Sequence, residues 1–346
     1  MEKEINTKLL RWYKKNKRIL PWRVLDLNNL PIPYYIFVSE YMLQQTTVQT
    51  VIKKFNEFIT IWPKIDNLAS SNEEKILNFW SGLGYYSRAR NLLKAAKKIK
   101  KNFNGTIPNN YKDLIDLPGV GEYTAKAILG IAYNKPVMPL DANIERIIAR
   151  IYAFQEPKNK IKKKLIDKSN LFISKNSSTN LIQAFMDYGS LVCSPRKPNC
   201  NICSFKYYCL SYKKKIQNTI PLKIKPTTLK RKKYSRAYIF CNEKNEILIR
   251  KRDSNGMLAS MLEVPNDKWV ENKKNLVLDN IANNFKKKIK LKGYLNYSFS
   301  HFDLYIEVYF TKVKKNLFKN YKWINRKKIN NSGLPTVMKK IIEIGN

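Results

Sequence analysis

The sequence has few acidic residues and no long apolar run. Its 26 Asp and Glu stand against 66 Lys and Arg, so the formal net charge is +40. This imbalance points to a polyanion partner such as DNA or RNA. Low Gly and Ala beside abundant Lys, Asn, Ile and Tyr is also typical of an AT-rich genome, so the charge supports nucleic-acid binding without proving it. No stretch reaches the about 18 apolar residues of a membrane span, and the first residues lack the apolar core of a signal peptide.

Cysteine is scarce, and four of the five cysteines fall in one short segment. Cys193, Cys200, Cys203 and Cys209 are separated by six, two and five residues. Such a cluster suits a metal site in a reducing compartment better than disulfides. The spacing favours an iron–sulfur cluster over zinc, because zinc sites usually contain two close pairs and here one pair is close. Zinc stays open on spacing alone. Cys241 lies in a β-rich run and is expected in a core.

The chain is long enough for two domains, and its pattern changes near residue 230. At 346 residues, each domain can bury a core of its own. The region up to about residue 186 is expected to be helical, with helices at 4–17, 35–45, 48–61, 72–80, 87–101 and 109–116 and one beginning near Glu122. Residues 213–233 carry nine basic and no acidic residues, which indicates an extended linker. Beyond it, strands are expected at 237–240, 247–249 and 304–310, and a helix at 275–290.

A Leu-Pro-Gly-Val-Gly run at 117–121 separates two helical patterns. Gly119 and Gly121 cannot continue a helix, and we expect a tight hairpin because glycine adopts positive φ without a Cβ clash. The N–H groups of the hairpin and of the helix near Glu122 would then form a site for one backbone phosphate of a nucleic acid. Asp141 precedes a helix expected near Asn143, and the local pattern alone allows a helix cap as readily as a functional carboxylate.

Together these motifs resemble the iron–sulfur branch of the helix-hairpin-helix DNA glycosylases. Within that branch the chain is similar to the MutY-type adenine DNA glycosylases, which remove adenine mispaired with 8-oxoguanine or guanine. The likeness covers nearly the whole chain, more weakly at 266–296 and after 312. The matching segments, besides the hairpin and the cysteines, are 20–23, 38–46, 82–92, 140–146 and 299–301. The resemblance implies one [4Fe–4S] cluster rather than zinc.

The resemblance also implies a multidomain organisation. The expected parts are an all-α helix-hairpin-helix glycosylase region with a [4Fe–4S] cluster loop (1–216), a basic linker (217–233) and a C-terminal α+β Nudix-like lesion-recognition domain (234–346). In the first part, residues 27–135 would form a six-helix subdomain containing the hairpin, and 1–26 with 136–216 the iron–sulfur subdomain. Residues 256–265 resemble the start of the Nudix fold, with Met261 where the family usually has Trp. Residues 266–280 lack the clustered Arg and Glu that would hold Mg²⁺, so this domain is expected to bind rather than hydrolyse.

The resemblance assigns four catalytic residues. Glu40 lies on an apolar helix that should raise its pKa, and it would protonate adenine N7 and later position water. Asp141, at a helix N-terminus that should lower its pKa, would face the oxocarbenium-like sugar as an anion or form a transient adduct. Asn143 and Tyr123 would position Asp141 and the sugar. On the residues alone, a carboxylate in a surface salt bridge is the alternative for Glu40.

Contact with DNA is expected along several segments, because a stacked base must be flipped out before it can react. Gln45 and Tyr85 would enter the stack beside the mispair, and a solvated helix surface is the alternative for Gln45. The full set expected to bind DNA is Trp22, Arg23, Leu43, Gln45, Thr46, Tyr85, Arg88, Gly119, Gly121 and Lys126. The resemblance assigns recognition of 8-oxoguanine to Phe299, Ser300 and His301. Ser300 would hydrogen-bond a feature that guanine lacks, and an ordinary strand residue is the alternative for His301.

Tyr123 separates two enzyme types. Relatives of the endonuclease III type carry Lys at this position, which forms a Schiff base and then cuts the strand, so the resemblance implies a monofunctional glycosylase here. A bifunctional endonuclease III-type pyrimidine glycosylase and AP lyase remains the enzyme alternative, and a degenerate DNA-binding protein the other. Intact Glu40, Asp141 and cluster cysteines disfavour the latter. We expect a monomer acting on double-stranded DNA with A:8-oxoguanine or A:G mispairs, located in the cytoplasm, nucleoid-associated when DNA-bound, and without a membrane partner.

Overall fold

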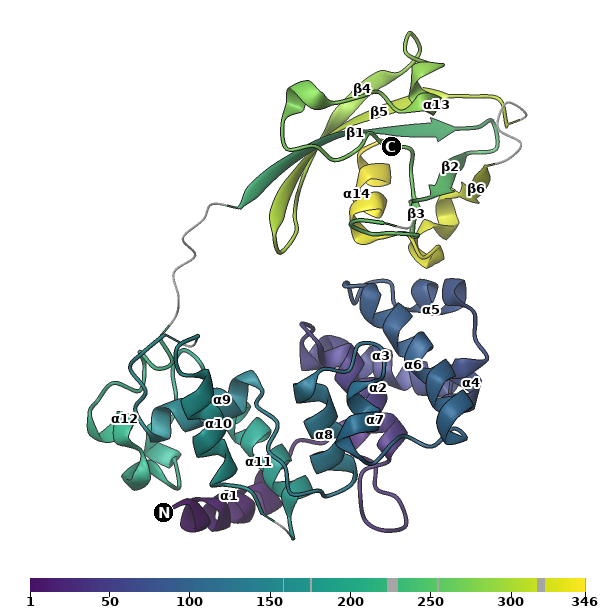
Figure 1. Ribbon diagram of the computed structural model, residues 1–346. Coiled ribbons are helices and arrows are strands. Elements are labelled where there is room, and N and C mark those ends of the chain that lie inside the picture. Colours follow the sequence, from purple (N-terminus) through teal and green to yellow (C-terminus); the bar gives the residue numbers. More distant parts are fainter. Residues whose placement is uncertain (158, 175, 223–229, 254, 316–320, 346) are drawn as a thin grey trace. The chain divides into compact units, whose positions relative to one another are not determined.

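The computed structural model describes residues 1–157, 159–174, 176–222, 230–253, 255–315 and 321–345 (Figure 1). It divides into two compact units. The first comprises Met1–Ser71 and Asn91–Lys225, and the second Asn72–Arg90 and Pro226–Asn346. Part of the expected linker, residues 223–229, lies outside the described residues. No helix in the described ranges is both long and apolar enough to span a membrane.

The first unit is helical, as expected. Its elements are α1 (Glu2–Asn16), η1 (Pro21–Arg23), α2 (Pro33–Leu43), α3 (Val48–Ile61), α4 (Ile65–Ala69), α7 (Tyr111–Ile115), α8 (Glu122–Ala132), α9 (Ala142–Ile151), α10 (Lys162–Asn170), α11 (Ser178–Leu191), η2 (Cys200–Ile202), η3 (Lys206–Tyr208) and α12 (Leu210–Lys213). α5 (Glu73–Phe79) belongs to the second unit, and α6 (Ser87–Phe103) begins in the second and ends in the first. The helices expected from periodicity are confirmed to within a few residues, and α4 was not expected.

α2 is a core helix, and it places Glu40 inside the unit. It begins at Pro33, whose fixed φ suits the first turn of a helix. Ile36, Phe37, Val38, Tyr41 and Met42 are all buried, so the helix is apolar on nearly every side. α2 packs against α3 and α8. Its one carboxylate is therefore held in apolar surroundings.

The expected hairpin joins α7 to α8, but its two glycines differ. Gly119 has φ +83°, which requires glycine, whereas Gly121 has φ −96° and is the N-cap of α8. The expectation that both glycines need positive φ is therefore wrong for Gly121. The Tyr41 hydroxyl of α2 donates a hydrogen bond to the Pro118 carbonyl at 2.5 Å, which ties the hairpin to the core helix.

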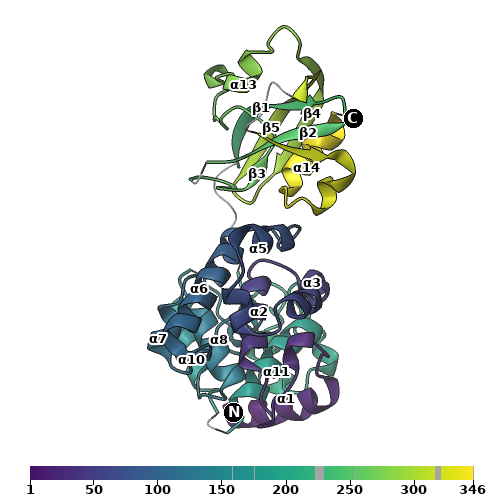
Figure 2. The same cartoon turned by 90° about the vertical axis from the view of Figure 1, so that its right-hand side faces the viewer.

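The second unit contains a six-stranded sheet in the order β3-β2-β1-β5-β4, with β6 paired to β2 (Figures 1 and 2). Its strands are β1 (Arg231–Cys241), β2 (Glu246–Lys251), β3 (Leu262–Glu263), β4 (Lys290–Ser298), β5 (Phe302–Lys312) and β6 (Lys322–Asn325). Its other elements include η4 (Lys273–Asn275), α13 (Asn280–Asn283), η6 (Arg326–Asn331) and α14 (Thr336–Ile344). β1 and β5 run parallel, and the other pairings are antiparallel.

Two apolar clusters cover the two faces of the sheet, because successive strand residues point to opposite sides. Ile239 and Cys241 belong to the cluster that α14 covers, and Tyr238 and Phe240 to the cluster that α13 covers. The expected burial of Cys241 is confirmed.

Two expectations for this unit need correction. The basic residues from Arg231 to Lys233 belong to β1, because they pair in register with β5; the strand thus begins before the expected boundary at 234. The helix expected at 275–290 is limited to α13. From Lys290 the chain is β4, in which half-buried residues alternate with exposed ones and pair with β5.

Candidate active site

A cavity of about 580 Å³ in the first unit brings the expected catalytic residues together. Glu40 from α2, Tyr123 from α8, and Asp141 with Asn143 from the start of α9 all line it. Five of the residues expected to bind DNA line the same cavity: Trp22, Arg23, Leu43, Gln45 and Thr46. Segments separated by about a hundred residues in the sequence therefore meet at one site.

Glu40 is held in a form that keeps its proton near neutral pH. The residue is 6% exposed. Loss of solvation raises its pKa to about 8, and the negative charge of Asp141 adds to the rise. A hydrogen bond with the Tyr123 hydroxyl lowers the pKa in part. The rise expected from the apolar helix is confirmed.

Asp141 is the N-cap of α9, and its carboxylate is fixed by short hydrogen bonds. Oδ1 accepts the backbone N–H of Ile144 at 2.6 Å, and Oδ2 accepts the Asn143 side-chain amide at 2.8 Å. The expected lowering of its pKa is wrong. Loss of solvation in the cavity raises the pKa above its usual value, although both hydrogen bonds and the charge of Arg146 oppose that rise. The helix N-terminus faces a cavity rather than open water, so both carboxylates have raised pKa values.

Tyr123 is hydrogen-bonded to one carboxyl group and feels the charge of both. Its hydroxyl is hydrogen-bonded to Glu40. Burial raises the pKa of Tyr123 well above its usual value, and the charges of Glu40 and Asp141 raise it further. The phenol therefore stays protonated, and it acts in this site as a neutral hydrogen-bonding group.

The mouth of the cavity includes the segment that follows α2. Gln45 has φ +60° and is exposed, and Leu43 and Thr46 are half-buried. The Gln44 side-chain amide donates to the Gly119 carbonyl at 3.4 Å, so this segment lies beside the hairpin. Gln45 is therefore accessible beside the hairpin.

Four residues expected to bind DNA have partners within the protein. Trp22 is buried, and the Arg88 guanidinium is buried and donates to two backbone carbonyls of the preceding loop. Arg23 Nη1 lies 2.7 Å from Oδ2 of Asp187, and Lys126 Nζ lies 2.8 Å from a Glu122 oxygen. Trp22 and Arg88 are thus held within the protein, and Trp22 also lines the cavity, so contact of either residue with DNA stays a prediction.

Sequence reasoning missed Asp187. Its side chain is fully buried in α11 and accepts bonds from Arg18 and Arg23, two residues that line the cavity. The available signal was its position between buried Ala184 and Tyr188 on the apolar face of α11, where an acid requires a cationic partner.

The cysteine segment follows α11 and is braced by α9. Burial is the main cause that raises the pKa of Cys200, Cys203 and Cys209, the last to about 11. The charge of Cys193 adds to the rise in all three, so the four thiols lie near each other. Arg150 Nη1 lies 3.2 Å from the Cys193 sulfur, and its guanidinium also donates to three carbonyls at 193–195. Among the described residues, no group of three or more His, Cys, Asp or Glu side chains is preassembled around a metal position. Four neighbouring thiols beside a guanidinium fit an anionic thiolate-bound cluster in their chemistry.

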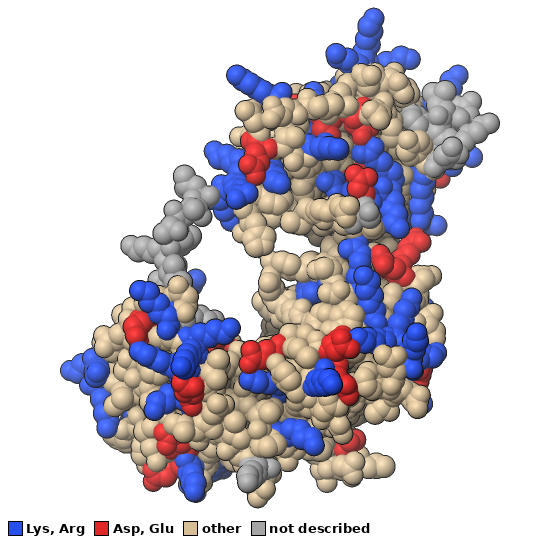
Figure 3. All heavy atoms as spheres, viewed as in Figure 1, with Lys and Arg blue, Asp and Glu red and all other residues tan. Residues whose placement is uncertain are grey.

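The residues assigned to lesion recognition lie in the second unit, in the turn between β4 and β5. The Phe299 N–H donates to the Phe302 carbonyl at 2.9 Å, and Ser300 and His301 are exposed. The hydroxyls of Tyr85 and Ser300 are hydrogen-bonded, and both residues line a cavity of about 520 Å³ in this unit. Basic side chains outnumber acidic ones on the visible face of each unit (Figure 3).

Two family models match the chain. The HhH-GPD superfamily base excision DNA repair protein matches residues 38–169, and the NUDIX domain matches residues 236–344. An adenine DNA glycosylase of Buchnera aphidicola subsp. Baizongia pistaciae is 37% identical, over 96% of this chain and 94% of its own length. One from Buchnera aphidicola subsp. Schizaphis graminum is 34% identical over 97% of each chain.

Solved structures agree with the fold of the helical unit. A thermostable thymine-DNA glycosylase matches 62% of this chain and 97% of its own at a TM-score of 0.55 and 27% identity. A trapped endonuclease III–DNA covalent intermediate matches 62% of this chain and 99% of its own at a TM-score of 0.52; at 20% identity it shows the fold alone.

Proposed function

Because this chain belongs to the adenine DNA glycosylases of base excision repair, we propose that it hydrolyses the N-glycosidic bond of adenine paired with 8-oxoguanine or guanine and leaves the strand uncut. The observation that carries this proposal is one cavity containing a protonated Glu40, which is hydrogen-bonded to Tyr123, and a hydrogen-bonded Asp141. A flipped adenine and its sugar would occupy that cavity, with Gln45 at its mouth taking the vacated place in the stack.

The two carboxyl groups would then divide the chemistry. Glu40 gives its proton to adenine N7, so the C1′–N9 bond breaks with its electron pair leaving on adenine. Asp141, held by Asn143 and the α9 backbone, stabilises the positive charge that develops on the sugar. Water then adds to C1′, and Glu40 takes back the proton that this water loses. Tyr123 has no amine to form a Schiff base with the sugar, so the abasic strand remains intact.

The second unit would read the base opposite adenine. Ser300 and His301 are exposed at the tip of their turn, and the Ser300 hydroxyl can both donate and accept a hydrogen bond. We place the discrimination of 8-oxoguanine from guanine in this turn. The chain would consist of a catalytic region, a basic linker and a Nudix-like domain that begins at β1. It would act as a monomer in the cytoplasm.

The cysteine loop would hold one [4Fe–4S] cluster through Cys193, Cys200, Cys203 and Cys209. When bound, such a cluster supplies a rigid anionic centre, and its role here is structural. Arg150 already lies beside the Cys193 sulfur and complements that charge. The loop between the ligands carries Arg196, Lys197 and Lys206, whose side chains would contact backbone phosphate.

The test is single-turnover excision on four duplexes: A opposite 8-oxoguanine, A opposite G, A opposite T, and thymine glycol opposite A. Release of adenine from the first two alone, with an unbroken abasic strand, supports the proposal. Cleavage of the thymine glycol duplex would assign an endonuclease III-type activity instead, and tight binding without product would indicate a DNA-binding protein. Glu40→Gln should bind the lesion duplex and lose excision, whereas Glu57→Gln, on the exposed side of α3, should retain both.

A further inference from the structure

The turn at 299–301 has an exposed tip and a packed base. Ser300 and His301 are exposed, the Ser300 hydroxyl is hydrogen-bonded to that of Tyr85, and Phe299 is half-buried. A turn of three residues is intrinsically loose, so a reading contact made at its tip depends on what fixes its base. Besides the Tyr85 bond at Ser300, Phe299 is a residue through which the described protein fixes that base.

An aromatic cluster holds Phe299. Its ring lies 4.9 Å from Phe302, 4.9 Å from Tyr297 and 5.6 Å from Trp269, measured between ring centroids. Phe302 and Tyr297 belong to the two strands that the turn connects. Trp269 comes from a separate segment, between β3 and η4, so it is the contact that ties the turn to the rest of the unit.

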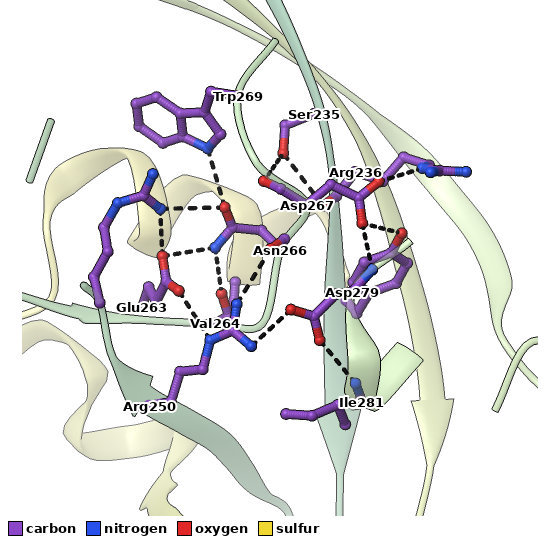
Figure 4. A network of polar contacts seen from close by, with 12 residues as sticks. Ser235, Arg236, Arg250, Glu263, Val264, Asn266, Asp267, Trp269, Asp279 and Ile281 are labelled. Atoms are coloured by element: carbon purple, nitrogen blue, oxygen red, sulfur yellow. Dashed lines mark hydrogen bonds and ion pairs between the residues drawn. The ribbon is translucent and has the colours of Figure 1, made fainter. Parts of the chain in front are cut away.

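A buried polar network fixes Trp269 in turn (Figure 4). The indole Nε1 donates to Asn266 Oδ1 at 3.0 Å, and the Asn266 amide donates to Glu263 Oε2 at 2.8 Å. Glu263 is 3% exposed and accepts Arg250 at 2.9 Å and also Arg252. The Arg252 guanidinium lies over the indole ring, 4.5 Å from its centroid. Network members constrain one another, so the indole has one favoured position.

Lys230 holds the backbone of the same turn. Its Nζ donates to the Phe299 carbonyl at 2.9 Å and to Ser298 Oγ at 2.7 Å. Asp303 Oδ1 lies 3.6 Å from the same ammonium group. The turn is thus held both through its apolar side chain and through its backbone, although neither anchor reaches the tip.

We propose that Trp269, set by Arg252 and Asn266, is a positioning residue that presets the 299–301 turn to discriminate 8-oxoguanine from guanine. This inference rests on the proposed function of that turn. A preset turn loses no conformational entropy when DNA binds. A loose turn has the binding conformation in only a fraction of the molecules, and the apparent affinity of its contact with the base is reduced by that fraction. Trp269 touches no DNA itself, so its loss should change discrimination and leave the chemistry at Glu40 intact.

The experiment compares the single-turnover rates on A:8-oxoguanine and A:G duplexes in the full chain. Trp269→Ala should lower the ratio of the A:8-oxoguanine rate to the A:G rate roughly tenfold, because the turn would hold its reading conformation in only about one molecule in ten. The change should lie in the A:8-oxoguanine rate. Trp269→Phe keeps an aromatic ring beneath Phe299 and should restore the ratio to within about twofold. Tyr309→Ala removes a half-buried aromatic from the opposite face of the same sheet and should leave the ratio unchanged.

Ser300→Ala separates this inference from the function on which it rests. If Ser300→Ala lowers the ratio and Trp269→Ala does not, the positioning role is wrong and the reading turn stands. If Ser300→Ala leaves the ratio intact, the turn does not read the base, and the proposed discrimination fails. An equal loss in Trp269→Ala and Tyr309→Ala would trace the effect to general loosening of the unit and would overturn the positioning role.

Discussion

Base excision should fail at alkaline pH because Glu40 loses its proton. With a pKa of about 8, about nine tenths of the molecules carry that proton at pH 7, whereas a carboxyl with the usual pKa of 4.5 would be protonated in fewer than about one in a hundred. The single-turnover rate constant should therefore stay level up to about pH 8 and fall about tenfold for each further pH unit.

The same pKa difference makes a stability prediction. The folded protein binds the Glu40 proton more tightly than the unfolded chain, so this contribution is fully present below pH 4.5 and is lost as the pH rises through about 8. A rise from 4.5 to about 8 corresponds to about 5 kcal/mol. Glu40→Gln removes this titration, so the variant does not lose this stability as the pH rises. The difference in unfolding free energy, variant minus wild type, should therefore increase by up to about 4 kcal/mol between pH 5 and pH 8.

Two assays check these predictions: rate constants on the A:8-oxoguanine duplex from pH 6 to 10, and urea unfolding from pH 5 to 8. Tyr123→Phe is the diagnostic variant. The Tyr123 hydroxyl lowers the pKa of Glu40, so its removal should move the alkaline fall to higher pH. A rate constant that falls around a pH below 6 would refute a buried, protonated Glu40. So would a difference in unfolding free energy between Glu40→Gln and the wild type that does not change with pH.

Three further predictions concern the scaffold. Gly119→Ala should lower the free energy of unfolding by roughly 1–3 kcal/mol, because the φ of Gly119 is +83° and the new Cβ would lie 2.8 Å from a neighbouring side-chain carbon. The control Gly121→Ala should change it by less than about 0.5 kcal/mol, because a Cβ at Gly121 meets open space. Urea unfolding measures both. Asp187→Asn should cost roughly 3–5 kcal/mol at pH 7, because two arginines lose their buried partner. Burial raises the pKa of Asp187, but the two arginines outweigh this and hold the pKa in the folded protein below 3.8. The loss of unfolding free energy in Asp187→Asn should therefore be full above pH 3.8 and should vanish as the pH falls through the pKa of the folded protein. Cys209→Ser should reduce iron and acid-labile sulfide per purified chain, and Cys241→Ser, a core position outside the cluster, should leave both unchanged.

Much of the site follows from local pattern. The apolar run around Glu40 predicts a buried helix, and the structure confirms both the burial and the direction of the pKa shift. Asp141 next to a new helical period predicts an N-cap, which its bond to the Ile144 N–H confirms. The hairpin glycines separate two helices as expected, although only Gly119 of the two adopts positive φ. Each of these features is indicated by residues within about one helical turn of each other.

The expectations that were wrong depend on distant segments. The pKa of Asp141 follows the solvent that the rest of the cavity excludes rather than its own helix N-terminus. The helix expected at 275–290 is limited to α13, and its last expected residue, Lys290, instead pairs with Phe310 of β5 as the start of β4.

The sequence by itself thus determined the helices, the hairpin, the cysteine spacing and the family to which the chain belongs, because neighbouring residues carry backbone preference and motif. The tertiary structure alone decided that Glu40, Tyr123 and Asp141 share one cavity, that Asp187 gathers two arginines, and that Trp269 supports Phe299. The physical reason is that solvation and ion pairing depend on which residues lie close in space, and chain segments far apart in the sequence supply those neighbours.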